Sequence, residues 1–517
     1  MKKKSLLIIT GIIITAAIAC ALAVYLVNRG MQAGEDDAFV PSVGGKADVS
    51  NLKEAKITIY MEGRSNAVMP DVLAAVNGKL HAELKTKLAL EMIWEYPEQY
   101  LAKIKADIAA GKPCDAFFYS SSNFPESFRQ LAKEGLIKDL TEDLTTYAPD
   151  YISQFSNDER KAMCTDGKNY AIPYRIPTAQ RKCVMVRDDL MEKYKIPEIK
   201  NYEDFEVYLD TVKKNEPDLI PLDYWDTTLG LFSEVNGYAV LDYDIGLVYK
   251  WNDPAIKVMA WEQTPEFVEG IHKIKEWYDK EYLTKNVGIT SIDNNIISSG
   301  KWASFISNWG DEFGYNSILA SAGIKDYKFK AYPLNDGISP RNSPLESSLV
   351  INAKSEQSDR VLMFINWLQS KPENYDLLMY GVKGRNYIDR GDYIVPADVE
   401  SEQNSFFNWG WRVPFRNIAY ERANFPGLNE KVENYNKGIE EKTKYPPAVG
   451  FLPDYSSVQE IVALRKIDYS NMDKMVYNGT FVENDIEDII KEQKDNGVQR
   501  LVDEIQRQLD EFKQAGN

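Results

Sequence analysis

Short apolar runs alternate with amphipathic stretches through the first part of the chain. β-Branched and aromatic residues at 55–61 (AKITIYM), 90–96 (LEMIWEY) and 114–121 (CDAFFYSS) predict three strands. The stretches between them, 71–88 and 97–111, carry apolar residues at helical spacing. This alternation predicts a parallel sheet with covering helices, because parallel strands need crossover connections.

The carboxyl ends of these strands are candidate ligand positions, because ligands of open α/β sheets bind beyond those ends. They fall at 62–66, at Tyr96 and at 119–123. A helix is also predicted at 124–140, immediately after the third strand end.

The remainder of the chain continues the mixed pattern. Residues 265–283 carry apolar side chains on one helical face, and 343–355 followed by 359–370 predict a strand, a turn and a helix. Residues 498–512 predict an amphipathic helix whose apolar face is formed by Val498, Leu501, Val502, Ile505, Leu509 and Phe512.

The N-terminus carries an export signal. Three lysines precede residues 5–27, which contain no charge. Two outcomes stay open: cleavage before Cys20, in the lipobox-like AAIAC, would leave a lipidated N-terminus, whereas the apolar run 6–27 is long enough to span a bilayer uncleaved. Either way the body lies outside the cytoplasm. Residues 1–27 are therefore interpreted as signal or anchor, and 28–53 as a flexible tether.

Length, charge and composition limit the classes of function that we expect. A chain of 517 residues predicts more than one domain or lobe. A net charge of −17 argues against a nucleic-acid partner, which requires a basic surface. Aromatic residues make up 12%, with 31 Tyr and 10 Trp, and this favours carbohydrate binding, in which rings stack on sugar faces.

Several kinds of chemistry are not indicated. Four cysteines without a CxxC pair predict neither a disulfide framework nor a zinc site, and two histidines exclude a His-rich metal centre. No P-loop, GxSxG or HExxH motif occurs. Neighbouring acidic residues such as Asp311 and Glu312 are expected to be solvated rather than a glycosidase pair. We therefore expect no cofactor and no catalytic site.

The stretch 380–387 (YGVKGRNY) follows the apolar segment YDLLM. A helix is expected to end near Tyr380, with Gly381 as its stop. Two roles stay open for Arg385: it donates to a ligand, or to a carboxylate on an opposite lobe, or it caps the preceding helix.

A series of motifs follows one another in a recognisable order. They are the export signal, ITIYMEG, DAFFYSSS, GLIKDLTEDLTTYAPD, KNYAIPYR, VMVRDDLMEKYKIPEIKNYEDFEVYL, SSGKWASF and SLVINAKSEQSDRVLMFINWL. In this order they resemble the extracellular solute-binding proteins of ABC importers, in particular the maltose-binding-protein-like sugar group. The tail, with YGVKGRNY, WGWRVPF, FLPDYSSVQEI and GVQRLVDEIQRQLDEF, resembles the longer LplA-type lipoproteins of Gram-positive bacteria.

The resemblance implies an α/β, two-lobed, Venus-flytrap fold, each lobe a mainly parallel sheet flanked by helices. The implied lobes are discontinuous: 54–175 with 330–375, and 176–329 with 376–517. A ligand, expected to be an oligosaccharide, would be held between the lobes and delivered to the transmembrane permease. The protein would be a monomer and not an enzyme.

Aromatic and polar side chains near strand ends and between the lobes are the predicted ligand-binding residues. For each, core packing or a surface position is the competing interpretation. The predicted set is Glu62, Arg64, Tyr119, Ser121, Tyr174, Arg175, Trp225, Asp226, Trp309, Asp311, Arg385 and Trp409. Two alternatives remain at this level, a secreted carbohydrate-active enzyme and a structural surface lipoprotein.

Overall fold

The computed structural model describes residues 51–514, apart from 66, 96, 121–127, 166, 177, 178, 180, 224–228, 284–296, 336, 398–409, 424–427 and 478–482. The chain divides into two compact units, Met1–Val40 and Pro41–Asn517, and everything described lies in the second. Within the described ranges, no helix is long and apolar enough to cross a membrane. The predicted anchor, with Cys20, lies outside those ranges.

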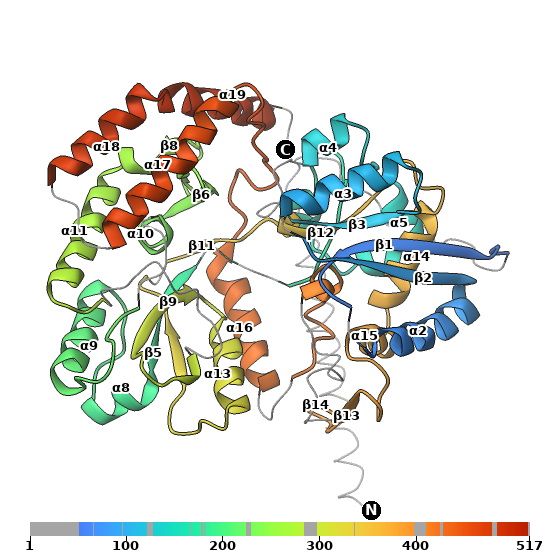
Figure 1. The fold of residues 1–517 in the computed structure, drawn as a ribbon, viewed down its shortest axis with the longest axis horizontal. Helices are drawn as coiled ribbons and strands as arrows, with labels where there is room; N and C mark the ends of the chain where they lie inside the picture. Colours follow the sequence, from blue (N-terminus) through green and yellow to red (C-terminus); the bar gives the residue numbers. More distant parts are fainter. Residues whose placement is uncertain are drawn as a thin grey trace, which may run out of the picture. The chain divides into compact units, whose positions relative to one another are not determined.

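The first sheet has five strands in the order β2-β1-β3-β12-β4 (Figure 1). They are β1 (Ala55–Glu62), β2 (Thr86–Ile93), β3 (Ala116–Ser120), β4 (Ile172–Pro173) and β12 (Ser347–Ile351). β1 pairs in parallel with β2 and β3, as the alternating pattern predicted. β12 runs antiparallel to both β3 and β4, so β4 runs parallel to the first three strands.

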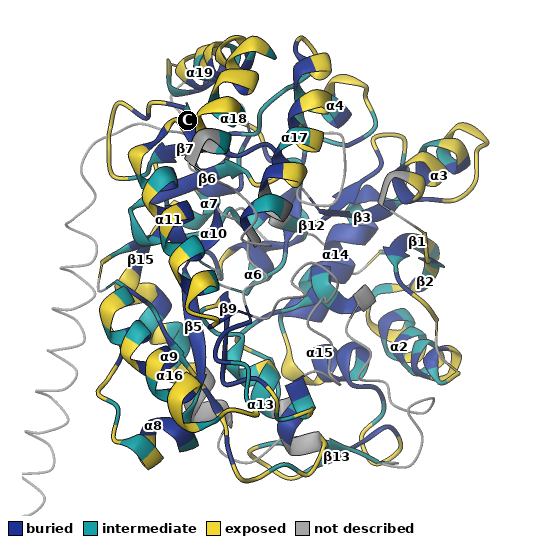
Figure 2. Ribbon diagram, turned by 60° about the vertical axis from the view of Figure 1, so that its left-hand side comes forward, coloured by how far each residue is buried: buried dark blue, intermediate teal, exposed yellow. Residues whose placement is uncertain are grey.

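Helices pack around this sheet, and Figure 2 shows its strands largely in the colour of buried residues. The helices are α2 (Met69–Leu84), α3 (Pro97–Ala109), α4 (Phe128–Lys133), α5 (Asp143–Tyr147), α6 (Pro149–Ile152), α7 (Asn157–Ala162), α14 (Ser358–Gln369) and α15 (Pro372–Met379). All of these helices except α7 contribute to the first core, a hydrophobic cluster with residues from 57–172 and 345–415.

Two predicted boundaries were wrong around β2. The helix expected at 71–88 ends at Leu84, because Lys85 adopts a left-handed conformation with φ of 51° and closes the helix. The chain then enters β2 at Thr86, so the strand expected at 90–96 ends at Ile93 and Trp94 follows it. The helix expected at 124–140 is shorter too, since α4 ends at Lys133.

The second sheet contains β10 (Phe329–Tyr332), β5 (Lys182–Arg187) and β9 (Ser304–Asn308), in that order. Both pairs of β5 are antiparallel, in contrast to the first sheet. Residues 220–223 extend the sheet by parallel bridges to 302–305.

Helices α8 (Asp188–Tyr194), α9 (Tyr202–Asn215), α10 (Gly230–Val235) and α11 (Pro265–Asp279) share the second core with β5 and β9. Helix α13 (Glu312–Ser321) follows β9, and α16 (Leu428–Lys442) lies beside it in Figure 1. A third sheet contains β6 (Tyr238–Asp242), β7 (Leu247–Lys250) and β8 (Met259–Ala260), which leads into the short helix η1 (Trp261–Gln263).

Helices α17 (Gln459–Tyr477), α18 (Glu483–Asp495) and α19 (Val498–Gln514) close the chain. The apolar face predicted for 498–512 is confirmed, because all six of its residues are buried and pack with β6, β7 and β8 in the third core. The remaining elements are β11 (Ser339–Pro340), β13 (Tyr387–Asp389), β14 (Ile394–Pro396), β15 (Thr443–Lys444), η2 (Pro344–Glu346) and η4 (Gly410–Phe415).

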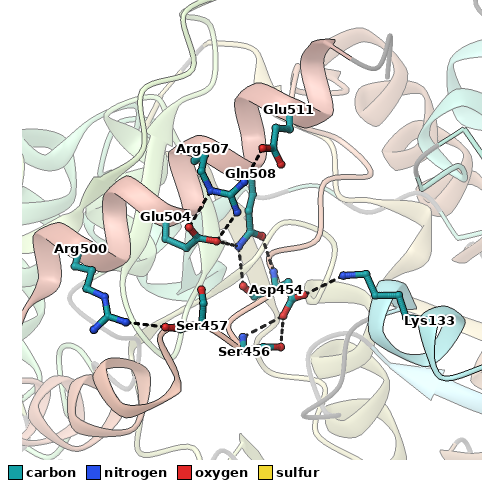
Figure 3. A network of polar contacts seen from close by, with 9 residues as sticks. All are labelled: Lys133, Asp454, Ser456, Ser457, Arg500, Glu504, Arg507, Gln508 and Glu511. Atoms are coloured by element: carbon teal, nitrogen blue, oxygen red, sulfur yellow. Dashed lines mark hydrogen bonds and ion pairs between the residues drawn. The ribbon is translucent and has the colours of Figure 1, made fainter.

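The segment between α16 and α17 contacts both the first core and α19. Leu452 packs against the first core, while Ala448 and Phe451 belong to the third. Asp454 forms an ion pair with Lys133 of α4 at 3.3 Å. The side-chain amide of Gln508 in α19 makes two hydrogen bonds with the backbone of Asp454 (Figure 3). The segment therefore ties the C-terminal helices to α4.

Candidate ligand-binding site

The carboxyl ends of four strands meet at one edge of the first sheet. β1, β2 and β3 are parallel, and β4 runs in the same direction. Glu62 and Ser120 therefore end their strands at the edge where Pro173 leads into Tyr174. Ser347 begins β12 there, and its carbonyl accepts from the Tyr174 N–H at 3.3 Å. This edge is where an open α/β sheet binds ligands.

A cavity of about 120 Å³ lies beside Tyr174 and Arg175. Its walls come from the segments after β4 and before β12, from α16 and from the loops around them. The lining residues are Phe155, Glu159, Tyr174, Arg175, Ile176, Arg341, Asn342, Ser343, Pro344, Ile418, Asn436, Glu440 and Tyr445. The mixture of rings, guanidinium groups, amides and hydroxyls suits a polar ligand that also has apolar faces.

Arg175 is held in this cavity by neutral oxygens. Its Nη1 donates to Gln154 Oε1 at 2.8 Å and to Asn417 Oδ1 at 3.4 Å, and its guanidinium lies 5.2 Å from the centre of the Phe155 ring. Asn417 is fixed in turn, donating to Gln154 and to Gln369 Oε1. Burial lowers the pKa of Arg175 because the cation loses hydration.

Arg341 contributes a second guanidinium. It follows β11, which pairs with β15, and its Nε donates to Thr443 Oγ1 at 3.0 Å. The guanidinium lies 5.2 Å from the centre of the Tyr445 ring. Burial raises the pKa of Tyr445 to about 12, so its hydroxyl keeps the proton it can donate. In the described part of the chain, neither Arg175 nor Arg341 forms an ion pair with a carboxylate.

A second cavity of about 310 Å³ lies at the end of β9, on the other side of α16. Its lining residues are Trp309, Gly310, Glu312, Phe313, Asn434 and Tyr435. The Arg181 guanidinium lies 4.8 Å from the Trp309 ring centre, and Tyr435 meets that ring edge-on at 5.1 Å. Gly438 permits this packing, since a Cβ there would lie 2.8 Å from the indole. Asn434 and Tyr435 line this cavity while Asn436 and Glu440 line the first, so α16 separates the two.

The predicted residues Tyr174, Arg175 and Trp309 thus line cavities, and their ligand roles stay predictions. Asp311 lies beside Trp309, but its Oδ2 accepts from the Ser307 hydroxyl at 2.6 Å and from the backbone and side chain of Asn308. That carboxylate holds the turn between β9 and α13.

Three other predicted residues belong to the first sheet. Glu62 is half-buried at the end of β1, and burial raises the pKa of its carboxyl. Arg64 is exposed and lies over the Trp94 ring at 4.5 Å. Tyr119 is 1% exposed and its ring packs against Phe128, so it contributes to the core. Their ligand roles also stay predictions.

Arg385 is exposed and forms an ion pair with Asp71 in the first turn of α2. It lines neither of the two cavities. The expected helix end near Tyr380 is confirmed, because α15 ends at Met379 and Gly381 has φ of 87°. Ser121, Trp225, Asp226 and Trp409 lie outside the described residues.

Sequence reasoning missed several residues at these positions: Trp94, Arg341, Tyr435 and Tyr445. Trp94 was hidden because the second strand was expected to run through it. Arg341, Tyr435 and Tyr445 lie in segments where the sequence pattern did not predict the end of a strand, so they were not selected as candidates. Within the described ranges, no group of three or more His, Cys, Asp or Glu side chains could hold a metal ion.

Comparisons with known proteins bear on this arrangement. Residues 69–375 match the sequence model described as bacterial extracellular solute-binding protein, and residues 447–514 match a domain of unknown function, DUF3502. A curated carbohydrate ABC transporter substrate-binding protein from Streptococcus pneumoniae is 23% identical over 464 residues, covering 88% of this chain and 90% of that protein.

Solved structures share the fold. The N-glycan transport solute-binding protein NgtS from Streptococcus pneumoniae superimposes with a TM-score of 0.74 at 20% identity, covering 90% of this chain and 100% of that one. An extracellular solute-binding protein from Bifidobacterium longum subsp. infantis gives 0.63 at 15% identity, covering 89% and 98%. The two-lobed α/β fold predicted from the motifs is thereby confirmed.

Proposed function

Because the chain belongs to the bacterial extracellular solute-binding protein family, we propose that it captures an oligosaccharide between two lobes and delivers it to the transmembrane permease of an ABC importer. The relatives support the choice of ligand: the curated one is named for carbohydrate transport, and NgtS has been solved with Man1GlcNAc and with Man5GlcNAc.

The observation that carries the proposal is the cavity beside Arg175. Two guanidinium groups, those of Arg175 and Arg341, line it together with Tyr174 and Tyr445, and neither forms an ion pair with a carboxylate among the described residues. Guanidinium N–H groups are donors in a fixed geometry, and aromatic rings offer faces to the C–H surfaces of a sugar. The hydroxyl oxygens of a sugar would accept hydrogen bonds from the guanidinium groups, and the sugar ring would pack on the aromatic rings.

The protein would bind its ligand without transforming it, and energy for transport would come from the importer's ATPase. We place the body outside the cytoplasm, tethered by residues 28–53 to an anchor at 1–27. Lipid at Cys20 and an uncleaved helix are the two candidate anchors, and Cys20→Ala separates them, since only a lipidated protein would change its processing. We expect the protein to act as a monomer.

We also propose lobes that close on the ligand by a hinge at the crossing segments, including 174–176 and 337–344. Packing supports moving one predicted boundary: Leu378, Tyr387, Ile394 and Phe415 belong to the first core. We therefore assign 376–397 and 410–415 to the lobe that contains β1.

A glycan screen tests the proposal. Full-length protein in a detergent without a sugar headgroup should gain thermal stability with at least one of Man5GlcNAc, an alginate oligosaccharide and kestose, because a ligand that binds only the folded state raises the melting temperature. Arg175→Met should weaken that binding by about 1.5–3 kcal/mol, the scale of a hydrogen bond to a charged group.

Calorimetric titration measures this loss. Arg500→Met, a change at an exposed position of α19, is the matched control and is expected to bind normally. Unchanged affinity in Arg175→Met would contradict the assigned cavity. Release of shorter sugars on incubation would contradict a pure binding role and favour the enzyme alternative.

A further inference from the structure

The segments at which the chain is proposed to cross between the lobes lie together. Arg175 is bridged in parallel to Asn417, and the Arg341 N–H donates to the Lys444 carbonyl at 2.7 Å, where β11 pairs with β15. Arg175 and Arg341 also line one cavity. Crossing segments that lie together act as one hinge point, because their backbones absorb the rotation in the same place. A rotation about one point has no fixed axis, so a second contact between the lobes is needed to fix one.

Residues 448–454, which follow β15, supply a contact of this kind; we call them the strap. They lie at the start of the region that matches the domain of unknown function. Leu452 packs against the first core, and Asp454 forms its ion pair with α4. Gly450, with φ of 82°, lies so close to the end of α7 that a Cβ there would be 2.7 Å from the Cys164 carbonyl oxygen. Alternate residues of the strap therefore contact the lobe that contains β1.

The other side of the strap is fixed to α19. Phe451 belongs to the third core, and its ring meets the Phe512 ring edge-on, with 5.6 Å between the centres. The Gln508 amide accepts from the Asp454 N–H at 2.8 Å and donates to the Asp454 carbonyl at 2.7 Å (Figure 3). These three side chains are buried, whereas Leu452 is only partly buried. We therefore expect the strap to move with α19, and its contacts with the other lobe to be the ones that adjust.

We propose that the strap is a second pivot, by which the domain of unknown function confines the closing of the two lobes to one axis. The crossing segments form the first pivot, and the contact of Gly450 with the Cys164 backbone forms the second. Because Gly450 has no side chain, the two backbones can turn against each other without repacking. The inference rests on the proposed closure of the lobes, and it assigns a conformational role to the C-terminal helices.

Loss of the second pivot should widen the range of lobe arrangements in the ligand-free protein. Ligand binding must then order a broader ensemble, so the affinity falls although no contact with the ligand is removed. The expected loss is about fivefold, the lower end of the coupling between distant sites.

Distances between two spin labels measure this range. Unnatural amino acids that carry a nitroxide, in place of Ala74 on α2 and Lys214 on α9, report on the two lobes from exposed positions. Double electron–electron resonance on the full-length, ligand-free protein should give a wider distance distribution in Gly450→Ala than in the wild type. Gly497→Ala is the matched control, because Gly497 has a similar φ of 89° but the side chain nearest its Cβ position is Ile461 of α17. It should leave the distribution unchanged.

Leu452→Ala tests the strap without backbone strain, and it decides the matter if Gly450→Ala does not fold. It removes the apolar contact with the first core and should also widen the distribution. Leu241→Ala is its control, since Leu241 is likewise partly buried but packs against the third core. Calorimetric titration with Man5GlcNAc, an alginate oligosaccharide and kestose should show about fivefold weaker binding in both strap variants for any glycan that the wild type binds, and normal binding in both controls.

The outcomes separate this inference from the proposed function. Unchanged distance distributions in both strap variants would overturn the pivot, and so would an equal widening in the two controls. A wider distribution with unchanged affinity would overturn it as well, and tighter binding would instead show a latch that holds the lobes open. All of these leave the proposed function standing. If the wild type binds none of the three glycans, the proposed function fails, and the distance distributions alone decide the pivot.

Discussion

Asp223 is a buried carboxyl. It is 2% exposed, and among the described residues its Oδ2 has no hydrogen-bond partner. Its backbone N–H donates to the Ser304 carbonyl, which places it beside β9. Burial raises its pKa from 3.8 to about 6, because the charged form loses hydration. At the residue scale, this group couples stability to pH.

Asp223→Asn should remove that coupling. Between pH 4 and 6 the folded protein retains a proton that the unfolded chain has lost, so the wild type loses stability as the pH rises through this window. The free energy of unfolding of the variant, relative to that of the wild type, should therefore increase by on the order of 2–3 kcal/mol from pH 4 to pH 7. Urea unfolding at both pH values measures the difference.

Asp218→Asn serves as the control, because Asp218 is exposed, three residues after α9 ends at Asn215. It should show no comparable change with pH. An equal pH dependence in wild type and Asp223→Asn would show that folding does not raise the pKa of this carboxyl.

At the scale of elements, a buried ion pair fixes α17 to the short helix η1. Arg465 binds both carboxylate oxygens of Glu262 at 2.8 Å, and the two side chains are 1% and 0% exposed. Arg465 also donates to Gln493 of α18 and to the Ile245 carbonyl. One guanidinium thus joins four segments of the chain.

Removing one partner should cost more than removing both. Arg465→Leu or Glu262→Leu leaves a buried charge uncompensated and should lower the free energy of unfolding by about 3–5 kcal/mol. The double variant should lose less than the sum of the two, because no isolated charge remains. Urea unfolding followed by fluorescence and circular dichroism measures all three, and strict additivity would contradict the coupling.

At the scale of the whole molecule, the segment before α17 connects the C-terminal helices with the first core. Lys133 and Asp454 form its visible ion pair, but Lys133 is 65% exposed. Gln508 is 6% exposed and holds the backbone of Asp454 with hydrogen bonds of 2.8 and 2.7 Å. The buried amide, more than the surface charge, should therefore hold the link.

Lys133→Ala should change stability by less than about 1 kcal/mol, the range of exposed ion pairs. Gln508→Ala should cost about 1–3 kcal/mol, since it leaves buried backbone groups unpaired. Thermal unfolding of both variants, at low and at high salt, measures the contrast. A larger loss in Lys133→Ala, reduced by salt, would show that the ion pair carries the link.

The local pattern determined much of this protein. β-Branched and aromatic content identified β1 and β3, and apolar periodicity identified α19, because a helix with one buried face imposes its period on the sequence. It failed at β2, where Lys85 ends a helix without a glycine or proline to mark the place. The motifs identified the family and its fold, because they occur along the chain in the same order as in that family.

Only tertiary structure decided which side chains meet. Trp94 and Tyr174 lie 80 positions apart in sequence and become level only through the sheet register. Arg175 and Arg341 line one cavity because β12 brings the segment before it next to β4. Sequence period reports which face of an element is buried, whereas strand order and register depend on contacts between distant segments, which no local pattern records.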